Sequence, residues 1–277
     1  MPYSFLAIAE TDPALLAELG LGVEGAIKAN GDVTLPDLAA PYLFSVHLPY
    51  SRDGRRFNVG SADDAVRRDA VETVKAAIDR AVGVGARRGI IHPMGLYRWD
   101  GSIEATWERT VEGLVEIVDH ARTAGLELCL ENVVHYWDGI PEELPPEQAD
   151  RTAVNHIFGC TPAEWLDLWR AIGREELRLC LDTSHAATYA ALSGEPQKAA
   201  RLLDEFLAEP GLIAHVHWSD SWLCDPRGRK DAHLPVGTGT LPHAFHARVK
   251  ALDATKHLEH KATPEQLRAE LAFIQAL

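Results

Sequence analysis

Short apolar runs recur along this chain, and many of them end in a histidine or an acidic residue. The run Leu179-Cys180-Leu181 ends in Asp182, and His185 follows three residues later. A short apolar run bounded by polar residues is typical of a buried strand in a parallel sheet. A carboxylate and an imidazole placed this way can bind a metal, although a helix-capping Asp with a packed His gives the same pattern. The pattern recurs in runs that end at His47, His92, Glu131, His217 and Glu259.

Strand and helix patterns alternate along the whole sequence. We expect strands at residues 4–8, 22–27, 43–47, 89–92, 126–131, 177–182, 212–217 and 256–259. Strands that alternate with helices imply a parallel sheet with helical crossovers. Eight such units in 277 residues predict an α/β protein with a closed (β/α)8 TIM barrel, a fold that typically needs about 250 residues. No linker divides the sequence, so residues 1–277 are expected to form one domain.

Capping residues and apolar spacing predict the helices. We expect helices at residues 13–19, 102–123, 196–208 and 242–252. Ser61 and Asp64 have the spacing of a capping box at the start of another helix. Thr161 and Thr263, each followed by a proline, are expected to cap two more. Residues 132–160 have no clear period, and a loop this long inside a compact domain is usually functional.

The polar residues at the strand ends are the candidate functional site. In a (β/α)8 barrel, residues at the C-terminal ends of the strands converge on one mouth. Many histidines and carboxylates facing one cavity are costly to desolvate without cations. Mixed sets of this kind suit zinc, manganese or a similar divalent ion. We therefore predict that a divalent metal is bound at the mouth by His47, His92, Glu131, Asp182, His185, His217, Asp231, His233 and Glu259.

The remaining histidines and Glu24 are not expected among these ligands. His215 shares strand parity with His217, so it is predicted to lie in the core or to support a ligand. Glu24 lies before the end of its strand and is left out of the set. Surface or packing roles are expected for His120, His135, His156, His243, His246, His257 and His260.

Several of these motifs together resemble a known family. They are HLPY at His47, HP at His92, EN at Glu131, DTSHA at Asp182, HWSDS at His217, and DAH with a following GTG at Asp231. With Glu259, this set resembles the xylose isomerase-like TIM-barrel superfamily, and within it most closely the endonuclease IV branch (AP endonuclease family 2). The resemblance spans roughly residues 44–261.

The resemblance implies one to three divalent ions. In the endonuclease IV branch, three zinc ions are held at these motif positions. Carried over to this chain, the first ion would be bound by His47, His92 and Glu131, and the third by His185, Asp231 and His233. The second would be bound by Glu131, Asp182, His217 and Glu259. The sugar isomerases and epimerases of the same superfamily are similar, but use one metal at this second set.

Three functions remain open from the sequence. The first is a metal-dependent isomerase or epimerase of a small sugar or sugar phosphate, in which Glu131 and Glu259 transfer a proton beside a metal-polarised carbonyl. The second is a zinc-dependent phosphodiesterase that cleaves abasic DNA. The third is a non-catalytic barrel that only binds metal and ligand. The net charge of -14 and the acidic residues of segment 132–160 argue against a DNA partner, so the first function is preferred.

Aromatic and cationic residues on the predicted mouth loops are candidate substrate contacts. Tryptophan faces can stack on a sugar ring, and arginine binds phosphate well. For the tryptophans, packing at the rim is an equal alternative. The residues that we expect to touch substrate are Tyr50, Trp99, Trp137, Trp218, Trp222 and Arg229.

The sequence also bears on the compartment. The N-terminus has no basic leader with a long apolar stretch, and no run approaches about 18 apolar residues. The four cysteines have no CxxC spacing, and Cys129 and Cys180 fall within strand candidates. We therefore expect a cytoplasmic protein with reduced thiols and no membrane partner. The oligomeric state stays open.

Overall fold

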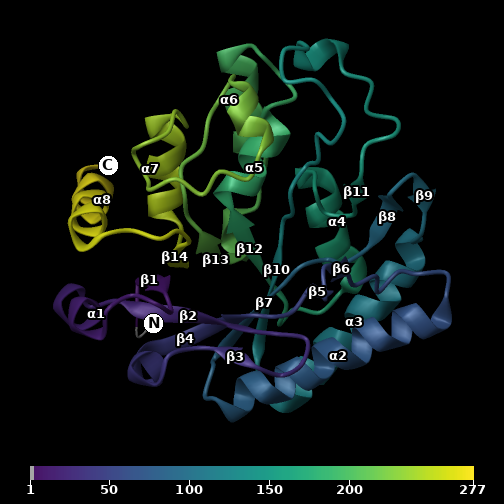
Figure 1. Cartoon of the computed structure of the whole chain (residues 1–277), viewed down its shortest axis with the longest axis horizontal. Helices are drawn as coiled ribbons and strands as arrows, with labels where there is room; N and C mark the ends of the chain where they lie inside the picture. The colour runs from purple at the N-terminus through teal and green to yellow at the C-terminus, as the bar shows by residue number, and fades with distance from the viewer. Residues whose placement is uncertain (1–2) are drawn as a thin grey trace.

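Eight parallel strands close into a barrel in the computed structural model of this chain, which describes residues 3–277 (Figure 1). The barrel strands are β1 (Phe5–Ile8), β2 (Gly22–Ile27), β4 (Leu43–His47), β7 (Arg88–Ile91), β10 (Glu127–Glu131), β12 (Arg178–Asp182), β13 (Ile213–His217) and β14 (Thr255–Leu258). Each pairs with its neighbour along the chain, and β1 pairs with both β2 and β14, which closes the sheet. The predicted (β/α)8 barrel is confirmed.

The helices surround this barrel (Figure 1). They are α1 (Pro13–Leu19), α2 (Asp64–Gly83), α3 (Trp107–Ala124), α4 (Pro162–Ile172), α5 (Thr183–Ala190), α6 (Pro196–Glu205), α7 (His243–Ala251) and α8 (Pro264–Ala276). Short 3-10 helices lie at η1 (Asp37–Tyr42), η2 (Pro146–Gln148), η3 (Pro210–Leu212) and η4 (Pro226–Arg229). Between β2 and β4 the connection is η1 and a short strand rather than an α-helix. Across the described range, 3–277, the helices lack the combination of length and apolar character needed to cross a bilayer.

Within residues 3–277, six short strands lie outside the barrel. They are β3 (Val33–Thr34), β5 (Ser51–Arg52), β6 (Arg55–Arg56), β8 (Leu96–Trp99), β9 (Ser102–Ile103) and β11 (His156–Ile157). Strand β3 adds to β2, and β5 and β6 form a hairpin after β4. Strand β11 pairs with β8, so the end of segment 132–160 is attached to the loop that follows β7.

Two predicted helix starts are wrong, and local hydrogen bonds explain both. Asp63, not Ser61, caps α2, because its Oδ1 accepts a hydrogen bond from Ala65 N at 2.8 Å. The helix predicted from residue 102 begins at Trp107 after a Thr106 cap. Ile103 lies instead in β9 and is 70% exposed. Thr263 caps the last helix as predicted, and it forms a capping box with Gln266.

Strand parity determines what fills the barrel interior. In a strand, residues two apart share a face, so Cys129 lies one layer below Glu131, and Cys180 one layer below Asp182. Both cysteines are buried in a small apolar cluster with Ile90. The larger apolar core fills the space between the sheet and the helices. Glu131 and Asp182 are therefore in the layer above these cysteines, at the ends of their strands.

Candidate metal centre

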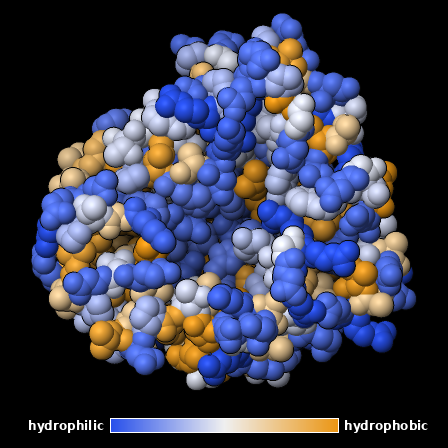
Figure 2. Space-filling view, viewed as in Figure 1, coloured by the Kyte–Doolittle hydropathy of each residue, from blue (hydrophilic) through white to orange (hydrophobic). Residues whose placement is uncertain are grey.

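A polar cavity of about 720 Å³ lies at the mouth of the barrel. Figure 2 shows a hydrophilic hollow near the centre of this face of the molecule. Seven of the nine predicted ligands line the cavity: His47, His92, Glu131, His185, Asp231, His233 and Glu259. The other two, Asp182 and His217, are fully buried and contact these residues from below. The strand ends thus bring the predicted set together.

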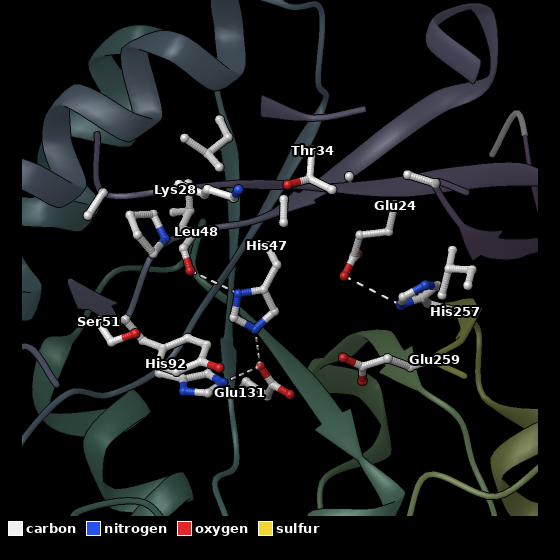
Figure 3. A pocket seen from close by; sticks show the side chains of 18 of the residues that line it. Glu24, Lys28, Thr34, His47, Leu48, Ser51, His92, Glu131, His257 and Glu259 are labelled. Atoms are coloured by element: carbon white, nitrogen blue, oxygen red, sulfur yellow. Dashed lines mark hydrogen bonds and ion pairs between the residues drawn. The ribbon is translucent and has the colours of Figure 1, made fainter. Parts of the chain in front are cut away.

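The first group of donors meets at one oxygen of Glu131 (Figure 3). Oε2 of Glu131 lies 3.2 Å from Nε2 of His47 and 3.1 Å from Nε2 of His92. Nδ1 of His47 donates to the carbonyl oxygen of Leu48 at 2.8 Å. That carbonyl can only accept, so Nδ1 carries a proton, and an ion bound beside Glu131 would replace the proton that Nε2 shares with Oε2 of Glu131.

The second group meets at His217. Its Nδ1 lies 2.9 Å from Oε1 of Glu131 and 3.0 Å from Oε2 of Glu259. Oδ2 of Asp182 is 3.9 Å from the same nitrogen. Three carboxylates and one imidazole from four different strand ends therefore converge on one point, which matches the predicted second set.

The third group lies on the far side of Asp182. Nε2 of His185 is 3.4 Å from Oδ2 of Asp231, and Nε2 of His233 is 2.8 Å from Oδ1 of the same carboxylate. Nδ1 of His185 donates to the carbonyl oxygen of Asn132 at 2.8 Å, so its Nε2 is also free to bind a cation. Donor atoms of Asp182, His185 and His233 lie within 4.8 Å of one another.

Two buried oxygens in this centre accept no hydrogen bond. They are Oδ2 of Asp182 and Oε2 of Glu259, the latter despite its closeness to His217 Nδ1. Burial raises the pKa of Asp182 to about 7. Burial acts on Glu131 too, but the neighbouring His217 and His92 hold its pKa well below the usual value. A divalent cation would supply the positive charge that these oxygens lack, so the donor set fits zinc or manganese.

Glu24 and His257 belong to this centre, although neither was predicted there. Glu24 is buried and lines the cavity, and its Oε1 lies 2.9 Å from Nε2 of His217. Ser45 Oγ donates to Glu24 Oε2 at 2.6 Å, and His257 Nδ1 is 3.4 Å from Oε1. The predicted ligand set left out Glu24, and the structure places it beside His217 as a further carboxylate of the cavity. The pairing of β2 with β4, which no local pattern in the sequence gives, places Glu24 beside Ser45.

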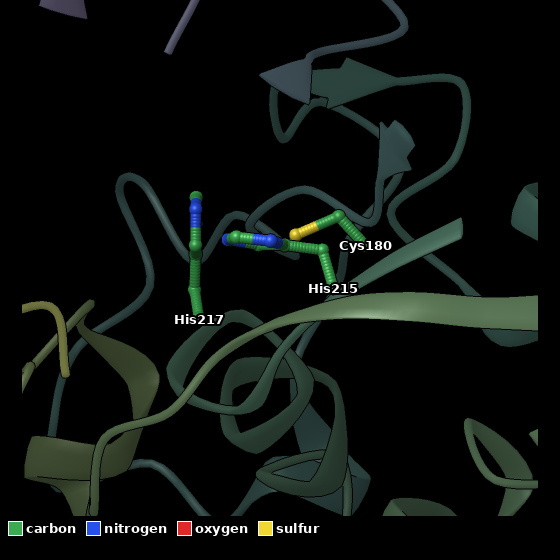
Figure 4. A group of neighbouring side chains, drawn as sticks. All are labelled: Cys180, His215 and His217. Atoms are coloured by element: carbon green, nitrogen blue, oxygen red, sulfur yellow. The ribbon is translucent and has the colours of Figure 1, made fainter. Parts of the chain in front are cut away.

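A deeper layer supports the same residues. His215 is fully buried, and its Nε2 lies 3.1 Å from Oε2 of Glu24. Figure 4 shows the thiol of Cys180 pointing toward the His215 ring, with the His217 ring beyond it. Donor atoms of these three residues lie within 4.8 Å of one another. Burial raises the pKa of the Cys180 thiol well above its usual value, which favours an uncharged packing residue.

Of the predicted substrate contacts, Tyr50 lines the cavity. Its ring stacks on His92 with a centroid distance of 4.4 Å. The four predicted tryptophans are not among the residues that line the cavity. Trp218 is fully buried, with Nε1 donating to His246 Nδ1 at 3.1 Å. Trp137 is also buried, and its Nε1 donates to the carbonyl oxygen of Thr188.

The other two tryptophans pack on the rim. Trp99 packs edge-on against Tyr136, with Arg56 over its face. Trp222 carries the Arg227 guanidinium 3.7 Å from its ring centroid. Both rings are thus packed against other side chains of the protein. This is the packing at the rim that was expected from the sequence as the alternative to substrate binding.

Arg229 binds the acidic segment 132–160. It is buried and donates to the carbonyl oxygens of Pro141 at 2.9 Å and Leu144 at 2.6 Å. The adjacent Lys230 pairs with Glu142. These two cations hold the segment against the barrel, and neither they nor the residues of the segment line the cavity. The lysine and arginine side chains among the residues lining the cavity are Lys28 and Arg52.

Comparison with known proteins gives the family. Residues 24–277 match the family model described as xylose isomerase-like TIM barrel. The chain is 26% identical over 278 residues to "Probable endonuclease 4" of Mycobacterium ulcerans, covering 99% of this chain and 95% of that protein. It is 25% identical over 198 residues to "Uncharacterized protein MJ1311" of Methanocaldococcus jannaschii, and this match spans 71% of the chain but only 56% of that protein.

Solved structures agree on the fold. A D-tagatose 3-epimerase-like protein superposes with a TM-score of 0.66 at 20% identity, covering 98% of both chains. Endonuclease IV from Thermus thermophilus superposes with a TM-score of 0.61 at 19% identity, covering 100% of this chain and 98% of that one. Both of the enzyme types considered from the sequence are thus built on this architecture. With the family model matching most of its length, the chain belongs to the xylose isomerase-like TIM barrel family.

Proposed function

We propose that this protein is a metal-dependent isomerase or epimerase of a small sugar or sugar phosphate. The observation that carries the proposal is the carboxylate pair Glu131 and Glu259, whose oxygens lie 2.9 and 3.0 Å from the same nitrogen of His217. Both carboxylates line a cavity of about 720 Å³. That volume is within the range of about 300–1,000 Å³ that is usual for small-molecule sites.

The second donor group is the proposed metal site of this reaction. Glu131, Asp182, His217 and Glu259 would hold the ion, which when bound polarises the substrate carbonyl and the adjacent hydroxyl. The unpartnered oxygens of Asp182 and Glu259 support this assignment. Zinc and manganese both suit the donor set, so each is a candidate for the bound ion.

The two glutamates have different access to a substrate. The side chain of Glu259 is 28% exposed, whereas that of Glu131 is 1% exposed. Burial opposes ionisation of Glu259, but His217 and His233 lower its pKa to about 2, so it is in the basic form at neutral pH. We assign to Glu259 the removal of the proton beside the carbonyl, and to Glu131 the proton transfer on the opposite face.

The proposed substrate contacts are residues that line the cavity but are outside the predicted ligand set. Lys28, Arg52, Tyr50 and Thr34 line it, and Figure 3 shows Lys28 and Thr34 on the side of His47 that faces away from Glu131. The ammonium of Lys28 suits a sugar phosphate and the hydroxyls suit a polyol, whereas the Arg52 guanidinium is paired with Asp69 at 3.0 Å.

An abasic-DNA phosphodiesterase is the second candidate. The observation that favours it is the presence of all three donor groups, including the pair His47 and His92 on one oxygen of Glu131. The mycobacterial relative named "Probable endonuclease 4" supports it as well. Arg229 and Lys230 both bind residues of segment 132–160, so these two cations would not contact the phosphates of a DNA duplex. A duplex needs many such contacts, so this function is placed second.

One experiment separates the candidates. The protein is depleted of metal, reloaded with zinc or with manganese, and incubated in deuterated water with a panel of ketoses and ketose phosphates. We expect solvent deuterium to enter one sugar at the carbon beside its carbonyl, and we expect Glu259→Gln to abolish this exchange. In parallel, an abasic duplex is offered at low salt. Incision that is lost on chelation, without sugar exchange, would favour the nuclease. Neither activity with either metal would favour the non-catalytic barrel.

A further inference from the structure

A second cluster of metal-binding side chains lies outside the barrel mouth, where segment 132–160 returns to helix α4. At its centre, Sγ of Cys160 lies 3.5 Å from Nδ1 of His135 and 3.6 Å from Nδ1 of His156. Oε2 of Glu164 is 3.9 Å from the same sulfur. Donor atoms of His156, Cys160 and Glu164 all lie within 4.8 Å of one another. None of these residues lines the mouth cavity.

We propose that His135, His156, Cys160 and Glu164 form a structural site for zinc, separate from the metals of the barrel mouth. One thiolate, two imidazoles and one carboxylate are a closed tetrahedral set of the kind that structural zinc takes. The proposal does not depend on the isomerase or the nuclease assignment.

The sulfur–nitrogen distances agree with such a site. In a tetrahedral zinc site with Zn–S near 2.3 Å and Zn–N near 2.0 Å, sulfur and nitrogen lie about 3.6 Å apart. The two distances from Cys160 Sγ, 3.5 and 3.6 Å, match this value. The Glu164 oxygen at 3.9 Å is slightly farther than tetrahedral geometry requires, and a small rotation of its carboxylate would correct this.

Local hydrogen bonds hold two of the proposed ligands side by side. Nε2 of His156 lies 2.9 Å from Oε1 of Glu164, and an ion bound by both residues would replace this hydrogen bond. The backbone of Glu164 is fixed at the start of α4, where its N–H donates to Thr161 Oγ1 at 3.2 Å. The N–H of Gly159 donates to Oε2 of Glu164 at 3.3 Å. His156 and Glu164 are therefore held next to each other before an ion binds.

Without a cation, the same side chains cannot all be satisfied. Cys160 is 1% exposed, and its single S–H can donate to only one of the two Nδ1 atoms that face it. Burial lowers the pKa of His135 to about 3, so this imidazole is neutral. Nε2 of His135 is buried and has no hydrogen-bond partner. A metal ion would bind the sulfur and both imidazoles at once.

A nucleophilic role for Cys160 is the alternative chemistry of a Cys–His–Glu arrangement. Burial raises the pKa of its thiol far above the usual value, whereas reactive cysteines have lowered pKa values and partial exposure. Buried at 1% exposure, the sulfur is out of reach of a substrate. A bound divalent ion would deprotonate the thiol without exposing it.

The ligands also connect the two ends of a long irregular segment. His135 follows β10 closely, whereas His156 is in β11 and Glu164 is in α4. An ion held by all of them would close the loop of residues 135–156, and closing a loop stabilises a fold by lowering the entropy of the unfolded chain. Tyr97 covers the outer side, with its ring 5.7 Å from that of His156.

Cobalt is the probe that isolates this site, because a thiolate ligand gives Co²⁺ a charge-transfer band in the near ultraviolet. The full chain is depleted of metal with a chelator and titrated with Co²⁺ alone. We expect a thiolate band whose final intensity corresponds to one cobalt–thiolate bond per chain and which is displaced by Zn²⁺. The band should be lost in Cys160→Ser and kept in Cys180→Ala, the matched control for the other thiol near histidines. It should also be kept in Glu131→Gln, which alters only the barrel metals.

A second variant keeps the proposal testable if Cys160→Ser does not fold. His156 is partly exposed, so His156→Gln is expected to keep the native circular dichroism spectrum while losing one zinc per chain by elemental analysis. Zinc should raise the melting temperature of the wild type more than that of this variant. The proposal is overturned if the wild type gives no thiolate band, if the band depends on Cys180 instead, or if the folded His156→Gln protein retains the full zinc content.

Discussion

Nε2 of His217 lies 2.9 Å from Oε1 of Glu24, and this contact determines which nitrogen of the imidazole faces the cavity. Burial opposes ionisation of Glu24, but His217 and His257 hold its pKa well below the usual value, so it is a carboxylate. A carboxylate can only accept, so Nε2 donates its proton to Glu24, and an ion held by Glu131 and Glu259 would take the place of the second ring proton on Nδ1. This is how outer residues usually orient a metal-binding histidine.

Glu24→Gln should therefore weaken metal binding without removing a ligand. The amide can offer an N–H to His217 where an acceptor is needed, which favours the wrong tautomer. We expect metal affinity, measured by competition with a chromophoric chelator, to fall about 10- to 100-fold. Glu10→Gln is the control, because Glu10 lines the same cavity but is exposed. Equal affinities in the two variants would show that Glu24 does not orient His217.

Glu131→Gln should abolish turnover while the fold stays intact. The substitution keeps the shape of the side chain but removes the charge that faces His47, His92 and His217. The matched control is Glu143→Gln in the exposed part of segment 132–160, which should retain wild-type activity. Circular dichroism checks the fold, and the exchange assay gives the activity. Wild-type turnover in Glu131→Gln would remove this residue from the reaction.

Metal removal should lower the stability of the protein. Protein purified without added metal should contain at least one divalent ion per chain by elemental analysis. Metal binds the folded state, so an ion at 100 times its Kd stabilises that state by about 2.7 kcal/mol. We expect dialysis against a chelator to lower the melting temperature, and zinc or manganese to restore it. An unchanged melting curve in metal-free protein would mean that the mouth residues do not bind an ion tightly.

The strand ends could be predicted because each has its own local signal. A buried parallel strand is an uninterrupted apolar run, and the polar residue that ends it is visible in the sequence. The runs ending at His47, Glu131, Asp182 and His217 are β4, β10, β12 and β13, with identical ends. The closed barrel then places these ends together, so a local pattern and one topological rule were enough to find the ligand candidates.

Helix α5 and Glu24 were missed because their signals are not local. Seven of the eight residues of α5 are buried, so no polar face alternates with an apolar one. Asp182 belongs to β12 and also caps α5, accepting from His185 N at 2.8 Å, which leaves no loop between strand and helix. Glu24 reaches His217 across the barrel, 193 residues away in sequence. By contrast, Trp218 directly follows His217, and strand alternation turns its ring away from the mouth into the core.

Arg229, which the sequence suggested as a substrate contact, should instead stabilise the fold. Its guanidinium is buried, donates to two carbonyl oxygens of segment 132–160, and lies 4.6 Å from the ring centroid of Trp137. Arg229→Ala would leave those carbonyl oxygens without their charged donor. We expect the free energy of unfolding to fall by about 2–3 kcal/mol, the usual range for losing hydrogen bonds to a charged group.

Arg227 provides the matched control for this prediction. It lies two residues earlier in η4, is exposed, and pairs with Asp225 at 2.7 Å. Because exposed ion pairs contribute little, Arg227→Ala should leave the urea unfolding midpoint unchanged. If Arg229 holds the segment, its loss shifts that midpoint while the KM of the remaining folded enzyme stays close to the wild-type value. A raised KM with an unchanged midpoint would instead place Arg229 on the substrate.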